Sequence, residues 1–403
     1  MSEWKKVKLG NLYEVHNGLS KGRQFFGTGF PFLTFSNVFN NWFLPEELES
    51  LVQTTDKERE ACSIKAGDVF ITRTSETMDE LGMSSVALKD YPNATYNGFT
   101  KRLRPITNRV NPRYIGYYLR TPKFRGQFMA FSTMTTRASL ANNDLLNMEV
   151  ELPSMEIQHR IATILSRYDS LIENYQKQIK LLEEAAQRLY KEWFIDLHFP
   201  GHENTNIIDG VPEGWEKKKV NSIIELQSGF AFKSSTFDDN GAYKIVTIKN
   251  VKDGAFDGDN VSRIVAIPEK MPKHCVLADG DILLSLTGNV GRVCIVNGKN
   301  YLLNQRVAKL ATDFKAFTYC LFRSREMFID INNLANGAAQ QNVSPIRIGE
   351  MKILLPNNKL LQEFESIVFK SIARIISLQS QLRLLTEARD RLLPKLMSGE
   401  INI

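Results

Sequence analysis

The strongest constraint on this chain is a long internal repeat. Residues 67–74 (GDVFITRT) correspond to residues 280–287 (GDILLSLT), and each copy continues to a Leu-Pro pair, Leu152-Pro153 or Leu355-Pro356. The copies lie roughly 200 residues apart, far more than the period of about 20–50 residues in solenoid proteins. The pattern therefore predicts two whole domains, and it favours a protein that contacts two separate patches of one long partner.

Each copy has the residue pattern of a mixed α+β domain. Short runs of apolar and β-branched residues alternate with Gly, Asn and Pro, which is typical of strands bounded by turns. Such runs are 68–72, 85–88, 243–248, 281–286 and 292–296. Residues 116–131 and 317–331 are expected to be helical. Together these segments predict an α+β fold for both copies.

A different period follows each Leu-Pro pair. Apolar residues then recur every three or four positions over several heptads, which predicts one long amphipathic helix in each copy. Ser154 is expected to cap the first helix, and Pro394 is expected to interrupt or kink the second. The predicted order is a domain over 1–153, a helix over 154–198, a domain over 199–356 and a helix over 357–403.

Neither helix can bury its apolar stripe within its own domain. The simplest packing pairs the two helices in an antiparallel coiled coil, which would place the domains at opposite ends of a dumbbell with approximate two-fold symmetry. A parallel pair, with the domains side by side, stays open as the alternative.

The net charge of +6 is unevenly distributed along the 403 residues. No Asp or Glu occurs between Asp90 and Asp144, an interval rich in Lys, Arg and aromatic residues. Such a stretch favours binding to nucleic acid, because neutralising phosphates releases counterions; a solvated surface neutralised by acids elsewhere in the fold is the alternative. A cytoplasmic protein is expected, because no apolar run could span a bilayer and the first residues lack a signal peptide.

Catalytic and metal-binding patterns are weak in this sequence. Asp68 and Asp281 follow Gly at strand starts and are expected to cap turns. The Asn111-Pro112 pair and residues 287–291 are interpreted as turns rather than as a methyltransferase motif or a phosphate loop. The cysteines lack the paired spacing of a zinc site and are expected to be buried apolar residues: Cys62, Cys275, Cys294 and Cys320.

Three stretches resemble the specificity (S) subunit of type I restriction–modification systems. They are the end of the first helix at 189–196 (LYKEWFID), the opening of the second domain at 211–216 (VPEGWE) and the C-terminal segment 393–401. The repeated Gly-Asp strands and the domain–helix–domain–helix order are similar as well. The resemblance covers essentially the whole chain.

The resemblance implies a non-catalytic DNA-binding subunit. Each domain would be a target recognition domain that reads one half of a bipartite sequence, and the coiled coil would fix the distance between the halves. The partners would be two modification (M) subunits, which bind S-adenosylmethionine and methylate adenine, and restriction (R) subunits. Cofactors, namely S-adenosylmethionine, ATP and Mg²⁺, are expected on those partners and not on this chain. A coiled-coil scaffold that joins two protein partners without binding DNA is the alternative.

Basic and amide side chains in loops beside the strands are candidate DNA contacts, because Arg suits guanine whereas Asn and Gln suit adenine. In the first domain they are Lys21, Arg23, Arg73, Lys101, Arg102, Arg104 and Arg137. In the second domain they are Lys233, Asn289, Arg292, Gln305, Arg306, Gln340, Gln341 and Asn342.

The repeat also aligns some of these loop positions with one another. Asn97 aligns with Asn304, and Arg137 aligns with Gln340. Different residues at such paired positions are what two different half-sites would need. At the end of the first helix, the aromatic residues Tyr190, Trp193 and Phe194 are candidate contacts with the M subunits.

Overall fold

The structure is a computed structural model of the chain and describes residues 4–75, 81–131, 138–259, 261–335 and 341–403. Two compact units divide the chain: unit 1 is Met1–Leu171 with Leu385–Ile403, and unit 2 is Ile172–Leu384. Two long helices, α6 (Met155–Tyr190) and α10 (Asn358–Met397), therefore contribute one segment each to both units. Among the described helices, none is long and apolar enough to cross a membrane.

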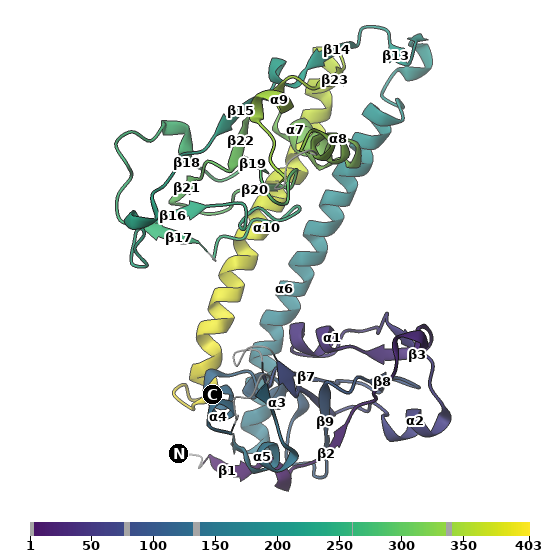
Figure 1. Cartoon of the computed structure of the whole chain (residues 1–403), viewed down its shortest axis with the longest axis vertical. Helices are drawn as coiled ribbons and strands as arrows, with labels where there is room; N and C mark the ends of the chain where they lie inside the picture. The colour runs from purple at the N-terminus through teal and green to yellow at the C-terminus, as the bar shows by residue number, and fades with distance from the viewer. Residues whose placement is uncertain (1–3, 76–80, 132–137, 260, 336–340) are drawn as a thin grey trace. The chain divides into compact units, whose positions relative to one another are not determined.

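Unit 1 is built on a four-stranded antiparallel sheet with the order β2-β9-β5-β7 (Figure 1). Its strands are β2 (Tyr13–Asn17), β9 (Thr100–Pro105), β5 (Val69–Thr72) and β7 (Ser84–Val86). A smaller sheet has the order β4-β3-β8, made of β4 (Leu51–Val52), β3 (Phe26–Leu33) and β8 (Thr95–Tyr96). Two further pairs complete the unit: β1 (Lys5–Lys8) with β11 (Glu149–Leu152), and β6 (Thr74–Ser75) with β10 (Ala138–Ser139).

The helices of unit 1 are short, apart from its share of α6 and α10. They are α1 (Phe35–Asn40), α2 (Asp56–Ala61), α3 (Pro112–Tyr118), α4 (Pro122–Phe131) and α5 (Asn142–Asn147). The single helix predicted over 116–131 is wrong: Pro122 starts a new helix, and the Thr121 hydroxyl accepts from the Phe124 amide at 3.3 Å. Asn111 caps α3 by accepting from the amides of Arg113 and Tyr114, which confirms its interpretation as a turn residue.

Unit 2 repeats the order of unit 1. Its main sheet, β15-β22-β19-β20, contains β15 (Glu225–Ser228), β22 (Val307–Ala311), β19 (Ile282–Ser285) and β20 (Val293–Ile295). A second sheet, β17-β16-β21-β18, contains β17 (Ser262–Ile264), β16 (Tyr243–Val246), β21 (Tyr301–Leu303) and β18 (Val276–Leu277). The parallel pair β16–β21 matches the parallel pair β3–β8 of unit 1. The predicted strands are therefore confirmed, within one or two residues at each end.

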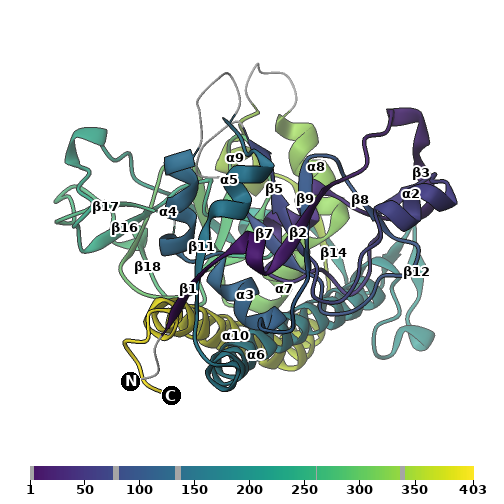
Figure 2. The same cartoon turned by 90° about the horizontal axis from the view of Figure 1, so that it is seen from below.

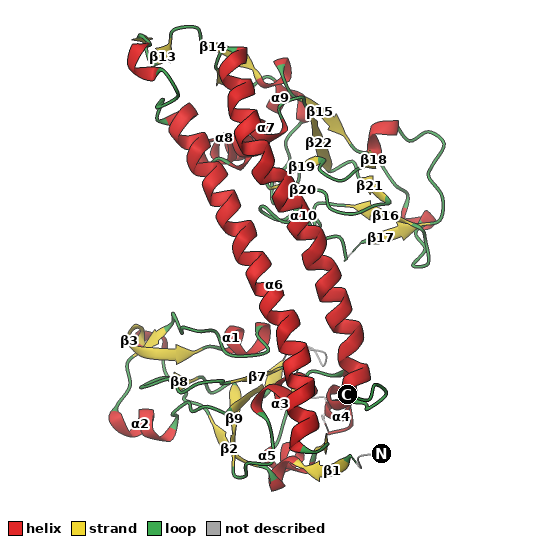
Figure 3. Ribbon diagram, turned by 180° about the vertical axis from the view of Figure 1, so that it is seen from behind, coloured by secondary structure: helices red, strands yellow, loops and turns green. Residues whose placement is uncertain are grey.

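Several of the remaining elements of unit 2 also have counterparts in unit 1. Strand β14 (Glu216–Lys219) pairs with β23 (Lys352–Leu355), as β1 pairs with β11, and a small hairpin joins β12 (Ile207–Ile208) to β13 (Val211–Pro212). Helices α7 (Lys315–Arg323), α8 (Arg325–Ala335) and α9 (Pro345–Gly349) follow the main sheet (Figure 3). The helix predicted over 317–331 is again two helices, because the Ser324 hydroxyl caps α8 by accepting from the Met327 amide at 3.2 Å.

Within each unit, α6 packs on α10. In unit 1, Ile161 and Leu165 near the start of α6 share an apolar core with Leu393 and Leu396 near the end of α10. In unit 2, Ala186 and Tyr190 near the end of α6 share a core with Leu360 and Phe364 near the start of α10. The early part of each helix thus meets the late part of the other, which confirms the antiparallel pairing. The predicted dumbbell placement of the domains stays a prediction.

Polar contacts join α6 to the sheet domain of each unit. In unit 1, Tyr117 of α3 donates to Asp169, which also pairs with Arg389 of α10 at 2.9 Å. In unit 2, Tyr319 of α7 donates to Glu183 at 2.6 Å, and burial raises the pKa of that carboxyl group. A tyrosine from the helix after the main sheet therefore holds α6 in both units.

Two further predictions concern the end of α10 and the cysteines. Helix α10 continues through Pro394 to Met397, so the predicted interruption at Pro394 is wrong, whereas the alternative of a kink there stays a prediction. In unit 1, the backbone of Gly399 lies against the Trp4 ring, so the segment that follows α10 lies beside the start of β1 (Figure 2). All four cysteines are free and buried, as predicted.

Candidate nucleic-acid interface

In each unit, several loops meet at one end of the main sheet, which we call the loop edge. In unit 1 it consists of residues 17–23, 73–75, 97–99 and 138–142, and in unit 2 of residues 228–233, 286–292, 304–306 and 341–345. The sheet register brings these loops together, because Asn17 at the end of β2 pairs with Lys101, and Thr72 at the end of β5 pairs with Thr100. Unit 2 has the same arrangement, with Ser228 opposite Ala308 and Ser285 opposite Val307.

A four-residue turn occupies the centre of each loop edge. The turn over 97–100 closes with the Thr100 amide donating to the Asn97 carbonyl at 3.2 Å, and the turn over 304–307 closes with Val307 donating to Asn304 at 3.0 Å. The side chain of each Asn also accepts from the amide two residues later, at 2.9 Å in unit 1 and 3.4 Å in unit 2. These side-chain contacts are typical of Asn in turns. We call the two elements the Asn turns.

The hydrogen bonds around the two Asn turns are equivalent. The amide of Arg73 donates to the carbonyl of Phe99, and the amide of Leu286 donates to that of Arg306, both at 3.0 Å. The amides of Gly98 and Gln305 donate to Leu19 and Phe230, at 2.8 and 3.0 Å. The predicted alignment of Asn97 with Asn304 is therefore confirmed.

A glycine permits the close approach of the loop that precedes each Asn turn. A Cβ atom on Gly18 would lie 2.0 Å from the Asn97 carbonyl oxygen, and a Cβ atom on Gly229 would lie 2.2 Å from that of Asn304. No side chain fits at such distances. The two units thus use the same packing of backbone on backbone to hold the same turn.

In unit 2, many of the predicted DNA contacts lie together. Gln305, Arg306 and Asn342 line an open hollow of about 600 Å³ with Ser228 and Thr287. The Thr287 hydroxyl donates to the Asn342 side chain at 3.0 Å, which orients that amide. Gln305, Arg306 and Asn342 are all exposed, as a contact with DNA requires.

The other candidates of unit 2 border this hollow. Asn289 is exposed and Arg292 is half-buried in the turn between β19 and β20, which confirms the predicted hairpin. The amide of Gly288 donates to the carbonyl of Gln341 at 3.0 Å, so the hairpin tip lies beside the exposed Gln341. Lys233 is exposed in the loop after β15.

In unit 1, three of the candidates reach the loop edge or the loop beside it. Arg23 is exposed, whereas Lys21 pairs with Glu58 of α2 at 2.8 Å, and the hydrogen bond from Lys21 lowers the pKa of that carboxyl group. Arg73 is half-buried directly after β5, and within the described part of the chain its buried Nε has no hydrogen-bond partner. Arg23 is therefore the most exposed of these three basic side chains.

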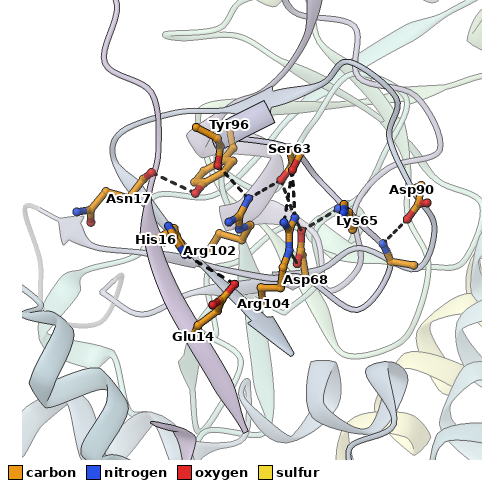
Figure 4. A network of polar contacts seen from close by, with 12 residues as sticks. Glu14, His16, Asn17, Ser63, Lys65, Asp68, Asp90, Tyr96, Arg102 and Arg104 are labelled. Atoms are coloured by element: carbon orange, nitrogen blue, oxygen red, sulfur yellow. Dashed lines mark hydrogen bonds and ion pairs between the residues drawn. The ribbon is translucent and has the colours of Figure 1, made fainter. Parts of the chain in front are cut away.

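Three candidates of unit 1 serve the fold instead, and their assignment to loops that contact DNA is corrected, because all three lie in strand β9. Lys101 and Arg102 lie in the central strand β9 and are only 4% and 2% exposed. Arg102 donates to the Ser63 carbonyl at 2.7 Å, and Arg104 makes two hydrogen bonds to Asp68, at 2.9 and 2.7 Å (Figure 4). Burial, with a smaller effect of Arg73, lowers the pKa of Lys101.

The acid-free interval as a whole is not the exposed basic surface that its composition suggests. Arg120 is mostly buried and donates to the carbonyls of Ser84, Val38, Phe39 and Asn41, and burial lowers its pKa to about 10. Its aromatic residues are largely core: Tyr114, Tyr117, Tyr118, Phe124 and Phe128. Strand β9 and helix α3 are central elements of the unit, so much of this charge is used inside the fold.

The aromatic residues at the end of α6 also require a correction. Tyr190 belongs to α6, while Trp193 and Phe194 lie in the π-helical turn Lys191–Ile195, and all three are 4–6% exposed. They pack in the core of unit 2, where the ring centroids of Phe194 and Phe364 are 4.8 Å apart. Side chains buried to this degree are not a surface for another subunit, so their assignment as partner contacts is wrong.

The Gly-Asp pairs have the predicted role as turn caps. The Asp68 carboxylate accepts from the Lys65 amide at 2.8 Å, and Asp281 accepts from the Ala278 amide at 2.9 Å. Each also pairs with a cation of the neighbouring strand, Asp68 with Arg104 and Asp281 with Lys309. No group of side chains suited to hold a metal ion occurs among the residues that the structure describes.

Sequence reasoning missed Phe99, which is 58% exposed at the same place in its turn as Arg306. The alignment of Asn97 with Asn304 was the signal that could have found it. The two remaining candidates, Arg137 and Gln340, lie outside the described residues, so their contact with DNA stays a prediction.

Comparison with known proteins agrees with the repeated fold. The family described as the type I restriction modification DNA specificity domain matches residues 1–184 and 212–384, one match for each copy of the repeat. The specificity subunit of the type I restriction enzyme MjaIX from Methanocaldococcus jannaschii is 27% identical over 100% of this chain and 94% of its own length. That of HindI from Haemophilus influenzae is 21% identical over 100% of both chains.

A solved structure has the same fold. The crystal structure of the S subunit of a type I restriction–modification system from M. genitalium gives a TM-score of 0.62 at 16% identity, over 98% of this chain and 96% of that one. Each of the two family matches thus contains one loop edge. The chain therefore belongs to the family of the type I restriction modification DNA specificity domain and is a type I specificity subunit.

Proposed function

We propose that this chain reads a bipartite DNA target, with one half-site contacted by the loop edge of each unit. The observation that carries this is the pair of Asn turns: the same backbone frame presents different exposed side chains, Phe99 beside a glycine in unit 1, and Gln305 and Arg306 in unit 2. A shared frame with different side chains is what recognition of two different sequences requires, because base edges are read by side chains.

Affinity would come from phosphate contacts beside the turns. Arg23 and Lys233 are exposed on the loops of the two edges, and Arg73 is half-buried beside the Asn turn of unit 1. Such contacts position a protein on the duplex without reading its sequence. Two readers in one chain also raise the effective concentration of the second contact once the first has formed.

The same proposal assigns no catalytic step and no cofactor to this chain. It recruits modification subunits, which supply S-adenosylmethionine and methylate adenine, and restriction subunits, which supply ATP and Mg²⁺ chemistry. The antiparallel pairing of α6 with α10 supports a role of the two helices in fixing the distance between the half-sites, because a helix pair is stiffer than a loop linker.

Removal of this gene is expected to abolish one methylated sequence motif in the genome. Methylated adenines are mapped in cells with the gene, without it and after its return on a plasmid. The expected result is a motif of two short defined parts separated by undefined bases, lost on removal and restored by the plasmid. Unchanged methylation in all three strains would contradict the proposal and would favour a scaffold that does not bind DNA.

A further inference from the structure

We propose that residue 99 in unit 1 and residue 306 in unit 2 are equivalent base-reading positions, with Phe99 contacting a thymine methyl group and Arg306 contacting a guanine. This inference rests on the proposed function and names the chemistry of that same site. It assigns one base pair in each half-site to one side chain. Its support comes from four features of the Asn turns.

The first feature is equivalent placement. Residues 99 and 306 are each the third residue of an Asn turn. The carbonyl of Phe99 accepts from the Arg73 amide, and the carbonyl of Arg306 accepts from the equivalent Leu286 amide. Neither residue has a positive φ, so the backbone accepts any L side chain at these positions. The side chain at this position is therefore not dictated by the turn.

The second feature is exposure without a structural task. Phe99 is 58% exposed, and Arg306 is exposed at the rim of the hollow of unit 2. Exposing a large aromatic ring to water is unfavourable. A thymine methyl group would cover that ring, and apolar side chains such as Phe do contact this group in the major groove.

The third feature separates base reading from phosphate binding. A position that bound a phosphate in both half-sites would need a donor in both units, and Phe99 has none on its side chain. Arg306 can donate two hydrogen bonds to O6 and N7 of guanine, which is the commonest specific contact of arginine with DNA. The two units thus have Phe and Arg at the same position of the Asn turn. This difference fits contact with a different base in each half-site better than contact with the phosphate backbone of the DNA.

The fourth feature is matched packing next to the turn. A Cβ atom on Gly98 would lie 2.5 Å from the Ser20 hydroxyl, so the serine fills the space that a side chain would need. In unit 2, the equivalent of Ser20 is Ala231, which follows Phe230 as Ser20 follows Leu19, and Gln305 occupies the equivalent of Gly98. Each turn thus has a neighbour suited to its own residues, a serine beside Gly98 and an alanine beside Gln305, so the difference between the turns extends into the surrounding loop.

The test exchanges the two side chains. Phe99→Arg, Arg306→Phe and Arg306→Ala are made in the full chain, and each variant replaces the wild-type gene in cells whose methylated adenines are mapped. Arg374→Phe, which replaces an exposed arginine on α10 of unit 2, is the matched control. Purified wild-type protein and variants are then titrated with duplexes in which each base pair of the motif is varied in turn.

The expected result is a change at one base pair of one half-site for each variant. Arg306→Phe and Arg306→Ala should lower the preference for guanine at that position by about 10-fold or more, since a bidentate pair contributes about 1–3 kcal/mol of discrimination. Phe99→Arg should replace thymine by guanine in the other half-site. The control should leave the motif unchanged.

Several outcomes would overturn the inference while leaving the proposed function intact. One is a wild-type bipartite motif that none of the exchanges alters. Another is an Arg306→Ala variant that weakens binding to all duplexes equally and flattens its salt dependence, which is the behaviour of a phosphate contact. A wild-type chain with no motif at all would instead contradict the proposed function itself.

Discussion

The variant Phe364→Ala is expected to lose about 3–5 kcal/mol of unfolding free energy, because truncating a buried phenylalanine removes apolar contacts and leaves a cavity. Phe364 of α10 is fully buried in unit 2. Its ring centroid lies 5.6 Å from that of Trp193 and 4.8 Å from that of Phe194. It therefore anchors α10 to the end of α6. Denaturant unfolding of the full chain, followed by tryptophan fluorescence, measures the loss.

Phe369→Ala is the matched control for this experiment. Phe369 lies five residues further along the same helix and is 47% exposed. Its truncation should change the unfolding free energy by no more than about 0.5 kcal/mol, as for an ordinary surface substitution. Equal losses for the two variants would contradict the assignment of Phe364 to the core of unit 2.

The second large effect is expected at the turn before β5. In Asp68→Ala, Arg104 loses a carboxylate that accepts two of its hydrogen bonds, and the Lys65 amide loses its acceptor (Figure 4). Removing one partner of a buried ion pair costs about 3–5 kcal/mol, and a value near 3 is expected because the Arg104 side chain keeps 20% of its exposure to water. Thermal or denaturant unfolding of the full chain measures it.

The variant Asp90→Ala distinguishes the contribution of the ion pair to stability from that of the turn cap. The exposed carboxylate of Asp90 accepts from the Ala66 amide at 2.7 Å, one residue from the contact that Asp68 makes, and forms no ion pair among the described residues. Its loss should cost about 1 kcal/mol, as for a single hydrogen bond at the surface. If Asp68→Ala cost no more than Asp90→Ala, the pair with Arg104 would not stabilise unit 1.

Much of the fold could be predicted from the sequence, because the repeat and the hydrophobic periods are visible there. The Gly-Asp pairs correctly predicted the positions of β5 and β19, and the Leu-Pro pairs correctly predicted where α6 and α10 begin. The breaks within 116–131 and 317–331 were missed, although Pro122 and Ser324 mark them. A helical period alone does not show where one helix ends and the next begins.

The site was harder to predict because composition does not show which way a charged side chain points. Lys101 and Arg102 are part of a basic interval, but β9 lies between β2 and β5, and both side chains are buried there. Phe99 was overlooked because an exposed aromatic residue looks like a core residue in a sequence. Its place became visible only when the hydrogen bonds of the two Asn turns matched.

The most direct test of half-site recognition by each unit exchanges one domain and maps methylated adenines. Residues 1–153 are replaced by the corresponding domain of another specificity subunit with a different target, and the chimera replaces the wild-type gene. We expect a motif in which one half changes to the sequence of the donor while the other half and the spacer stay the same. A motif that changed in both halves, or in neither, would contradict the claim that each unit reads its own half of the target.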